Sequence, residues 1–324
     1  MKDIISNSKM IYHMSLKDRK PFPITADIYL TDFCNNNCKY CGYRRFGQPL
    51  NKTHYITFED FKIYVNKLQT LGVKGFILTG GGEPTLNKDF DRIIEWLEEN
   101  NINYGINTNF NCYKAFKPKF LKISLDGWNN SSYQKIRGID AYDRVIGYIL
   151  KYDAYRKHKE IDVEMTIQMV ATKLSDVKKF YKFNKDLPVD HISIRPVESI
   201  AGQYYQDIHN YHEATRIVDY LTKLKEKDDR IIINYKWKLL NYRPRECFAK
   251  WTNLTINTNG DVLYCCNKPY EIVCNLKEEP SVIQAKLDFK TDMCKCDMPC
   301  RLSGPNYFLE DYEKNKNNPM NDFI

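Results

Sequence analysis

Long hydrophobic runs are missing from this sequence. Its apolar stretches all fall well short of the roughly 18 residues that a membrane-spanning helix needs. The N-terminus also lacks the sustained apolar segment and the small-residue cleavage site of a secretory signal. We therefore expect a cytoplasmic protein that has no membrane partner.

Blocks of like charge are absent as well. The 49 Lys and Arg and 41 Asp and Glu give a formal charge of +8, spread along all 324 residues. The 24 Tyr do not interleave with a basic stripe, as they would in a base-stacking platform. These features disfavour nucleic acid as a partner, and the positive charge mildly favours an anionic substrate.

Cysteine is scarce in the middle of the chain and concentrated toward both ends. Of the 11 Cys, three are Cys34, Cys38 and Cys41, Cys112 stands alone, and seven lie between residues 247 and 300. A chain without a secretory signal is not expected to carry a disulfide framework. The distribution instead predicts two separate thiolate sites on either side of an ordinary scaffold.

Strand-like and helix-like patterns alternate between residues 24 and 195. Strands are expected within residues 24–30, 75–79, 102–107, 120–125, 163–170 and 191–196, and helices within 57–68, 90–100, 143–157 and 176–183. The alternation predicts an α/β fold with a parallel sheet, open or curled into a partial barrel. Its chemistry is expected at the carboxyl ends of the strands.

The last third of the chain changes character. A helix over residues 209–228 is followed by short strand-like runs, and Asn259-Gly260 predicts a hairpin between two of them. We expect a domain boundary near residue 230. The predicted organisation is an N-terminal extension (1–22), the sheet domain (23–230), a small Cys-rich β domain (231–310) and a frayed tail (311–324).

The first cysteine group has the spacing Cys34-x3-Cys38-x2-Cys41 directly after a predicted strand. Three soft thiolates on one loop can hold three corners of a cubane cluster, and no fourth Cys follows nearby. One iron would then be open to a substrate or cofactor. A zinc knuckle is the alternative.

This spacing, with Tyr40 before the last cysteine, resembles the signature of radical S-adenosylmethionine (radical SAM) enzymes. The turn Gly80-Gly-Gly-Glu-Pro84 after the second strand is similar to the family's GGEP motif. Residues 123–128 (ISLDGW) and 133–138 (YQKIRG) are similar to segments of members with a C-terminal SPASM or twitch domain. The resemblance implies a partial (β/α)6 barrel that binds a 4Fe-4S cluster and SAM.

The resemblance also implies which side chains contact SAM. These are Tyr40, Gly81, Gly82, Glu83, Pro84, Asn107, Ser124 and Arg137. Gly81 and Gly82 would line the methionine moiety, with Glu83 facing its amino group. Ser124 and Arg137 would contact the ribose or the carboxylate.

The second cysteine group resembles the twitch form of the SPASM domain. Its candidate ligands are Cys247, Cys265 of a Gly-x4-Cys unit, Cys294, Cys296 and Cys300. We expect one auxiliary iron–sulfur cluster, of the 4Fe-4S type, held by Cys247, Cys265, Cys300 and one of Cys294 or Cys296. A structural zinc site is the alternative.

Three cysteines, Cys112, Cys266 and Cys274, remain without a ligand role, and burial is the usual state of such cysteines. Cys112 and Cys266 are candidate hydrogen-atom donors, since one follows the third strand and the other adjoins a ligand. His54 and His191 are expected to be structural or surface residues.

The resemblance implies an enzyme that cleaves SAM reductively to a 5'-deoxyadenosyl radical and abstracts a hydrogen atom from a substrate C–H bond. An auxiliary cluster favours net oxidation or crosslinking of a small sugar-like metabolite or a peptide. A Cys donor would make the enzyme an epimerase instead. The expected electron donor is of the flavodoxin or ferredoxin type. A non-enzymatic iron–sulfur or zinc protein that binds nucleic acid is the alternative from another class.

Overall fold

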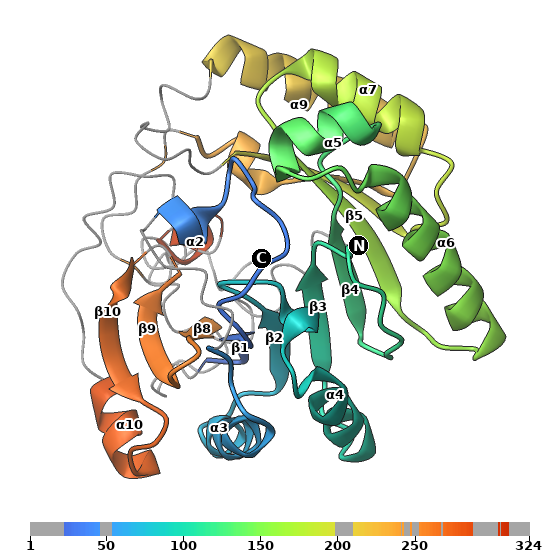
Figure 1. Ribbon diagram of the computed structural model, residues 1–324. Helices are drawn as coiled ribbons and strands as arrows, with labels where there is room; N and C mark the ends of the chain where they lie inside the picture. The colour runs from blue at the N-terminus through green and yellow to red at the C-terminus, as the bar shows by residue number, and fades with distance from the viewer. Residues whose placement is uncertain are drawn as a thin grey trace, which may run out of the picture.

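The computed structural model describes residues 23–45, 54–197, 210–240, 242, 247, 253–266, 268–287, 304 and 306–310. One ten-stranded sheet, in the order β10-β9-β8-β1-β2-β3-β4-β5-β6-β7, forms the core (Figure 1). Its parallel strands are β1 (Thr25–Tyr29), β2 (Gly75–Thr79), β3 (Tyr104–Thr108), β4 (Phe120–Ser124), β5 (Glu164–Ala171), β6 (His191–Pro196), β7 (Ile231–Ile233) and β8 (Asn253–Ile256). The six predicted strands are confirmed as β1 to β6, and the predicted α/β class is confirmed with them.

The helices that link the strands begin and end close to their predicted positions. They are α3 (Phe58–Thr70), α4 (Phe90–Glu99), α6 (Tyr142–His158), α7 (Leu174–Asn184) and α9 (Tyr211–Lys225). Other helical segments are α2 (Gly42–Arg45), η1 (Pro84–Leu86), α5 (Asn130–Arg137), η2 (Tyr235–Trp237) and α10 (Pro280–Leu287). None of the described helices is long and apolar enough to cross a membrane.

The two faces of the parallel sheet differ in polarity. On the helix-covered face, alternate strand residues such as Ile28, Leu78 and Ile123 are completely buried in the apolar core. On the opposite face, the register aligns Asn107 with Lys122, and Lys122 with Thr166. These polar residues are only half-buried. The strands therefore present a polar, accessible inner face, as expected of a barrel that holds a polar ligand.

The segments after residue 230 extend this sheet at both of its edges. β7 pairs in parallel with β6, while β8 pairs in parallel with β1 on the other side. β9 (Asp261–Cys265) returns antiparallel to β8 through the hairpin predicted at Asn259-Gly260, which is confirmed, and β10 (Lys268–Asn275) pairs with β9. The boundary near residue 230 stays a prediction, and the expected extension 1–22 and tail 311–324 lie outside the described residues.

Candidate active site

The first cysteine group lies on the loop that leaves the carboxyl end of β1, where the Gly-rich turn after β2 is hydrogen-bonded to it. The amide of Gly82 donates to the carbonyl of Thr31 (2.8 Å), and that of Glu83 donates to the carbonyl of Phe33 (2.7 Å). A Cβ on Gly82 would lie 1.9 Å from the Phe33 carbonyl oxygen. Only glycine therefore permits this approach, which joins the turn directly to the residue before Cys34.

The thiols of Cys38 and Cys41 lie close enough to Cys34 to contribute to its raised pKa. Burial, the nearby carboxylate of Glu83 and the two other thiols raise the pKa of Cys34 to about 12, against a hydrogen bond from the Asn36 amide. Each of the three side chains is half-buried. If these neighbouring thiols ionised, their negative charges would repel one another unless a cation or a metal cluster compensated them.

The donor set fits an iron–sulfur cluster. Among the described residues, no three Cys, His, Asp or Glu side chains converge as the ligands of one metal ion would. Three soft thiols on one short loop suit a cluster, since a cluster spreads its ligands over several irons.

Helix α5 holds the middle of the cysteine loop (Figure 1). The amides of Asn37 and Lys39 donate to the carbonyls of Arg137 (2.9 Å) and Ile136 (2.8 Å) at the end of the helix. Gly138, with φ of +76°, ends α5 in the left-handed conformation. A Cβ there would lie 2.4 Å from the Asn37 carbonyl oxygen, so the Arg-Gly pair serves the docking of this loop.

Asparagine side chains fix two of the three residues between Cys34 and Cys38, namely Asn35 and Asn36. Asn109 Nδ2 donates to Asn35 Oδ1 (2.8 Å), and Asn111 Nδ2 donates to Asn36 Oδ1 (3.4 Å). Asn36 Nδ2 in turn donates to the hydroxyl of Tyr133 on α5 (3.3 Å). The sequence analysis did not predict this network. The concentration of Asn in both loops was the available signal.

Both carboxylate oxygens of Glu83 accept hydrogen bonds from protein donors. Its Oε1 accepts from the hydroxyls of Thr108 (2.6 Å) and Thr85 (2.8 Å), and its Oε2 accepts from the Asn109 amide (2.7 Å). Burial raises the pKa of Glu83, against the effect of these hydrogen bonds. An amino group of SAM would share the Glu83 carboxylate with these protein donors. The next residue, Pro84, is buried at the start of η1.

Other predicted SAM contacts lie apart from this network. Asn107 and Ser124 lie on the inner face of β3 and β4. Asn107 Oδ1 is buried without a hydrogen-bond partner among the described residues. Tyr40 is half-buried beside Lys39. Arg137, by contrast, faces Asp126 and the sulfur of Cys38.

Both histidines considered from the sequence have carboxylate partners. His54 Nδ1 lies 2.5 Å from Asp32 Oδ2. Asp32 also accepts from the hydroxyls of Tyr43 (2.7 Å) and Thr258 (3.1 Å), so it ties the β8–β9 hairpin to the cysteine loop. His191 Nε2 lies 3.5 Å from Glu164 Oε2.

The described members of the second cysteine group, Cys247 and Cys265, belong to segments that follow β7. Cys265 ends β9 and pairs with Lys268. The register of β8 with β1 and β9 places it level with the start of β1, whereas Cys34 lies beyond the end of that strand. Cys247 is buried and accepts from Asn306 Nδ2 (3.7 Å). Cys294, Cys296 and Cys300 lie outside the described residues.

The remaining cysteines are separated from one another. Cys112 is half-buried in the loop after β3, and burial raises its pKa. Cys266 follows β9 and is half-buried. Cys274 on β10 is only 2% exposed, and burial raises its pKa to about 12.

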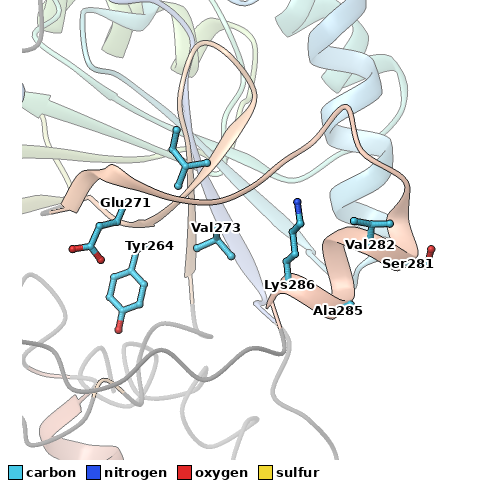
Figure 2. A pocket seen from close by; sticks show the side chains of 8 residues that line it. Tyr264, Glu271, Val273, Ser281, Val282, Ala285 and Lys286 are labelled. Atoms are coloured by element: carbon cyan, nitrogen blue, oxygen red, sulfur yellow. The ribbon is translucent and has the colours of Figure 1, made fainter.

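A shallow cavity of about 690 Å³ lies between β9, β10 and α10 (Figure 2). Figure 2 shows Tyr264 and Glu271 facing it from the strands and Val282 and Lys286 facing it from α10. Its described lining includes no residue of the cysteine loop or the Gly-rich turn. In Figure 1, α10 lies below β9 and β10 and α2 lies above them.

Residues 28–155 match the family model of the radical SAM superfamily. The chain is 28% identical over 171 residues to GTP 3',8-cyclase of Pasteurella multocida, which covers 49% of each protein. It is 35% identical over 201 residues to a probable GTP 3',8-cyclase of Pyrococcus abyssi, covering 59% of this chain and 64% of that protein. The chain thus spans about half of the first relative and under two thirds of the second.

Two solved structures share the fold. Streptococcus suis SuiB bound to precursor peptide SuiA superposes with a TM-score of 0.60 at 18% identity, covering 82% of this chain and 64% of SuiB. Native anSMEcpe with bound AdoMet also gives a TM-score of 0.60, at 17% identity, covering 90% of this chain and 96% of that chain. The family recognised from the cysteine spacing is confirmed, and with it the 4Fe-4S cluster and SAM as the cofactors of this domain.

Proposed function

We propose that the radical SAM domain of this chain binds its cluster through Cys34, Cys38 and Cys41 and directs radical chemistry to a substrate on the polar face of the sheet. The grouping of these thiols on one loop at the carboxyl end of β1 carries the proposal. When bound, the 4Fe-4S cluster supplies the electron that splits SAM into methionine and a 5'-deoxyadenosyl radical.

The residues of the chain contribute binding, orientation and exclusion of water. Three cysteines leave one iron open for the amino and carboxylate groups of SAM. The backbone of Gly81 and Gly82, which already lies against the cysteine loop, would face the methionine moiety. Asn107 and Ser124 would meet the rest of SAM on the inner face, where Asn107 Oδ1 still lacks a described partner.

The polar inner face supports a small, anionic substrate as the first candidate. Lys122 on β4 and Arg195 on β6 are half-buried on this face, among amides and hydroxyls. The curated relatives are named GTP 3',8-cyclases, and GTP is an anionic metabolite. A peptide is the second candidate, because the fold relative SuiB was crystallised with its precursor peptide.

We further propose an auxiliary cluster at Cys247, Cys265, Cys300 and one of Cys294 or Cys296. Cys265, the candidate ligand that the strand register places, lies level with the start of β1. An auxiliary cluster held by these cysteines could accept an electron from a substrate radical on the polar inner face of the sheet, which gives net oxidation. Return of a hydrogen atom from Cys112 or Cys266 would instead give epimerisation.

The first experiment measures SAM cleavage. The full chain, reconstituted anaerobically with iron and sulfide and reduced with dithionite, is expected to form 5'-deoxyadenosine and methionine. Cys38→Ala should abolish both products, whereas Cys274→Ala, a change at a buried cysteine on β10, should not. An iron-replete protein that forms neither product, with or without GTP, would contradict the proposal.

A second experiment addresses the auxiliary site. Iron and sulfide are counted in the Cys34→Ala/Cys38→Ala/Cys41→Ala variant, where only the second site can respond. About four irons per chain would support an auxiliary 4Fe-4S cluster and the oxidative reaction. Absence of iron would favour a zinc site or free thiols, and with it epimerisation. Deuterium from solvent retained at one carbon of the product would mark the thiol-donor route.

A further inference from the structure

Cys38 is the cysteine that helix α5 contacts most closely. The amides on both sides of it, those of Asn37 and Lys39, donate to the last carbonyls of α5. Arg137 Nη1 also donates to the Cys38 sulfur, at 3.3 Å. The backbone and the side chain of Arg137 thus hold the same ligand from two sides.

Arg137 is itself fixed in a buried position. Its side chain is 13% exposed, and its Nη2 forms an ion pair with Asp126, which is 5% exposed. Asp126 Oδ1 accepts from the amide of Val170 on β5 (2.6 Å), so the acid cannot follow a displaced arginine. The Cys38 thiol and the Tyr133 hydroxyl are the other titratable groups acting on this guanidinium. The sheet therefore fixes Arg137 against the cysteine loop.

We propose that Arg137 is a positioning residue for the iron–sulfur cluster: it orients the Cys38 sulfur and stabilises the reduced state of the cluster. The inference rests on the proposed function, because it needs Cys38 to be a cluster ligand. It differs from the role implied by the family resemblance, in which Arg137 contacts SAM.

The physical basis is charge. On reduction the cluster takes one electron from the external donor, with no bond formed or broken, and its negative charge grows by one unit. A donor to a ligand sulfur, and a fixed positive charge beside it, stabilise the more negative state and so raise the reduction potential. Replacing Arg137 would also leave Asp126 as an uncompensated acid near the cluster, which acts in the same direction.

The test is a potentiometric titration of the reconstituted full chain. The reduced state of the first cluster is monitored through the part of the EPR signal that changes when SAM is added. In Arg137→Gln, the reduced-to-oxidised ratio at a fixed potential should fall about tenfold, which is about 59 mV for one electron. Lys135→Gln, an exposed position on the same helix, is the matched control and should leave the ratio unchanged. SAM affinity, measured by equilibrium dialysis, should change less than twofold in both variants.

An unchanged potential in Arg137→Gln would overturn the inference, and so would a loss of SAM binding without a potential shift. If Arg137→Gln does not fold, Arg137→Lys carries the test, since it keeps the charge but loses the forked guanidinium. The ratio should then fall in the same direction by a smaller factor, and an unchanged ratio overturns the inference. A wild-type chain without any SAM-responsive signal would instead refute the proposed function itself.

Discussion

Gly82 and the residues around it decide how closely the Gly-rich turn approaches the cysteine loop. The turn contacts backbone at Phe33 and the ring of Tyr43, which leaves no space for side chains at Gly82 and Gly81. The motif is thus a packing device as well as a candidate ligand surface.

Gly82→Ala is expected to destabilise the protein by ~1–3 kcal/mol, because its Cβ meets a carbonyl group that cannot rotate away. Chemical denaturation followed by circular dichroism measures this change. Gly147→Ala is the matched control. Gly147 is exposed on α6 with nothing within 4 Å, so alanine there should stabilise the protein by ~0.5–1 kcal/mol. Equal stability of Gly82→Ala and the wild type would refute the close approach.

Cys274 should be chemically inert in the folded protein. It is 2% exposed with a pKa raised to about 12, so almost none of it is the reactive thiolate at neutral pH. Iodoacetamide labelling followed by mass spectrometry should leave Cys274 unmodified between pH 7 and 9, and modify it after unfolding in urea. Native labelling as fast as in urea would contradict this burial.

The raised pKa of Cys274 also predicts that the free energy of unfolding depends on pH. The ordinary pKa of 9.0 applies in the unfolded chain and about 12 in the folded one, so only the unfolded state ionises easily. The contribution of the neutral Cys274 thiol to the free energy of unfolding is complete below pH 9 and is lost as the pH rises from 9 toward 12. Cys274→Val should reduce the loss of unfolding free energy over this range.

At the scale of elements, α5 is a short helix with a specific task. Its first turn is closed by a capping box in which Asn129 accepts from the Ser132 amide (2.8 Å). Its last turn supplies the carbonyls and the guanidinium that hold the cysteine loop. Fraying at either end should therefore loosen the loop.

Asn129→Ala should cost ~1 kcal/mol of stability and also weaken retention of the first cluster. After timed exposure to an iron chelator, its remaining SAM-dependent formation of 5'-deoxyadenosine should be lower than that of the wild type. Asn210→Ala removes the equivalent cap of α9, where Asn210 accepts from the His212 amide (2.9 Å). That variant should lose similar stability but keep wild-type retention. Equal retention in the two variants would show that α5 does not govern the loop.

At the scale of the whole molecule, strands from the first and the last parts of the described chain pair in one sheet. β8 covers the edge of β1, and β7 covers the edge of β6. The segment after residue 230 thus supplies strands to both sides of the parallel sheet.

A chain truncated after residue 230 is expected not to fold cooperatively. It would expose the backbone edge of β1 beside the buried Ala26 and Ile28, and an uncovered edge promotes aggregation. Circular dichroism melting and light scattering measure the outcome. A cooperative, non-aggregating melt would establish residues 23–230 as an autonomous domain.

The sequence by itself determined the local structure and the family of this protein. Alternating periodicity located β1 to β6, Asn259-Gly260 located the hairpin, and the spacing of Cys34, Cys38 and Cys41 indicated the cofactor. These signals are local, because a strand, a turn or a chelating loop depends on neighbours within a few residues. They could be read without knowing which elements pack together.

Only the tertiary structure decided the partners of these residues. The residue pattern of β8 does not mark this strand as a neighbour of β1, because strands at either edge of a sheet share the same periodicity. Thr25 and Asn253, whose side chains are hydrogen-bonded, lie 228 residues apart. Packing of α5 against the cysteine loop likewise placed Arg137 at Cys38, whereas its contact with SAM stays a prediction. Contacts of this kind depend on how whole elements dock, which no local pattern records.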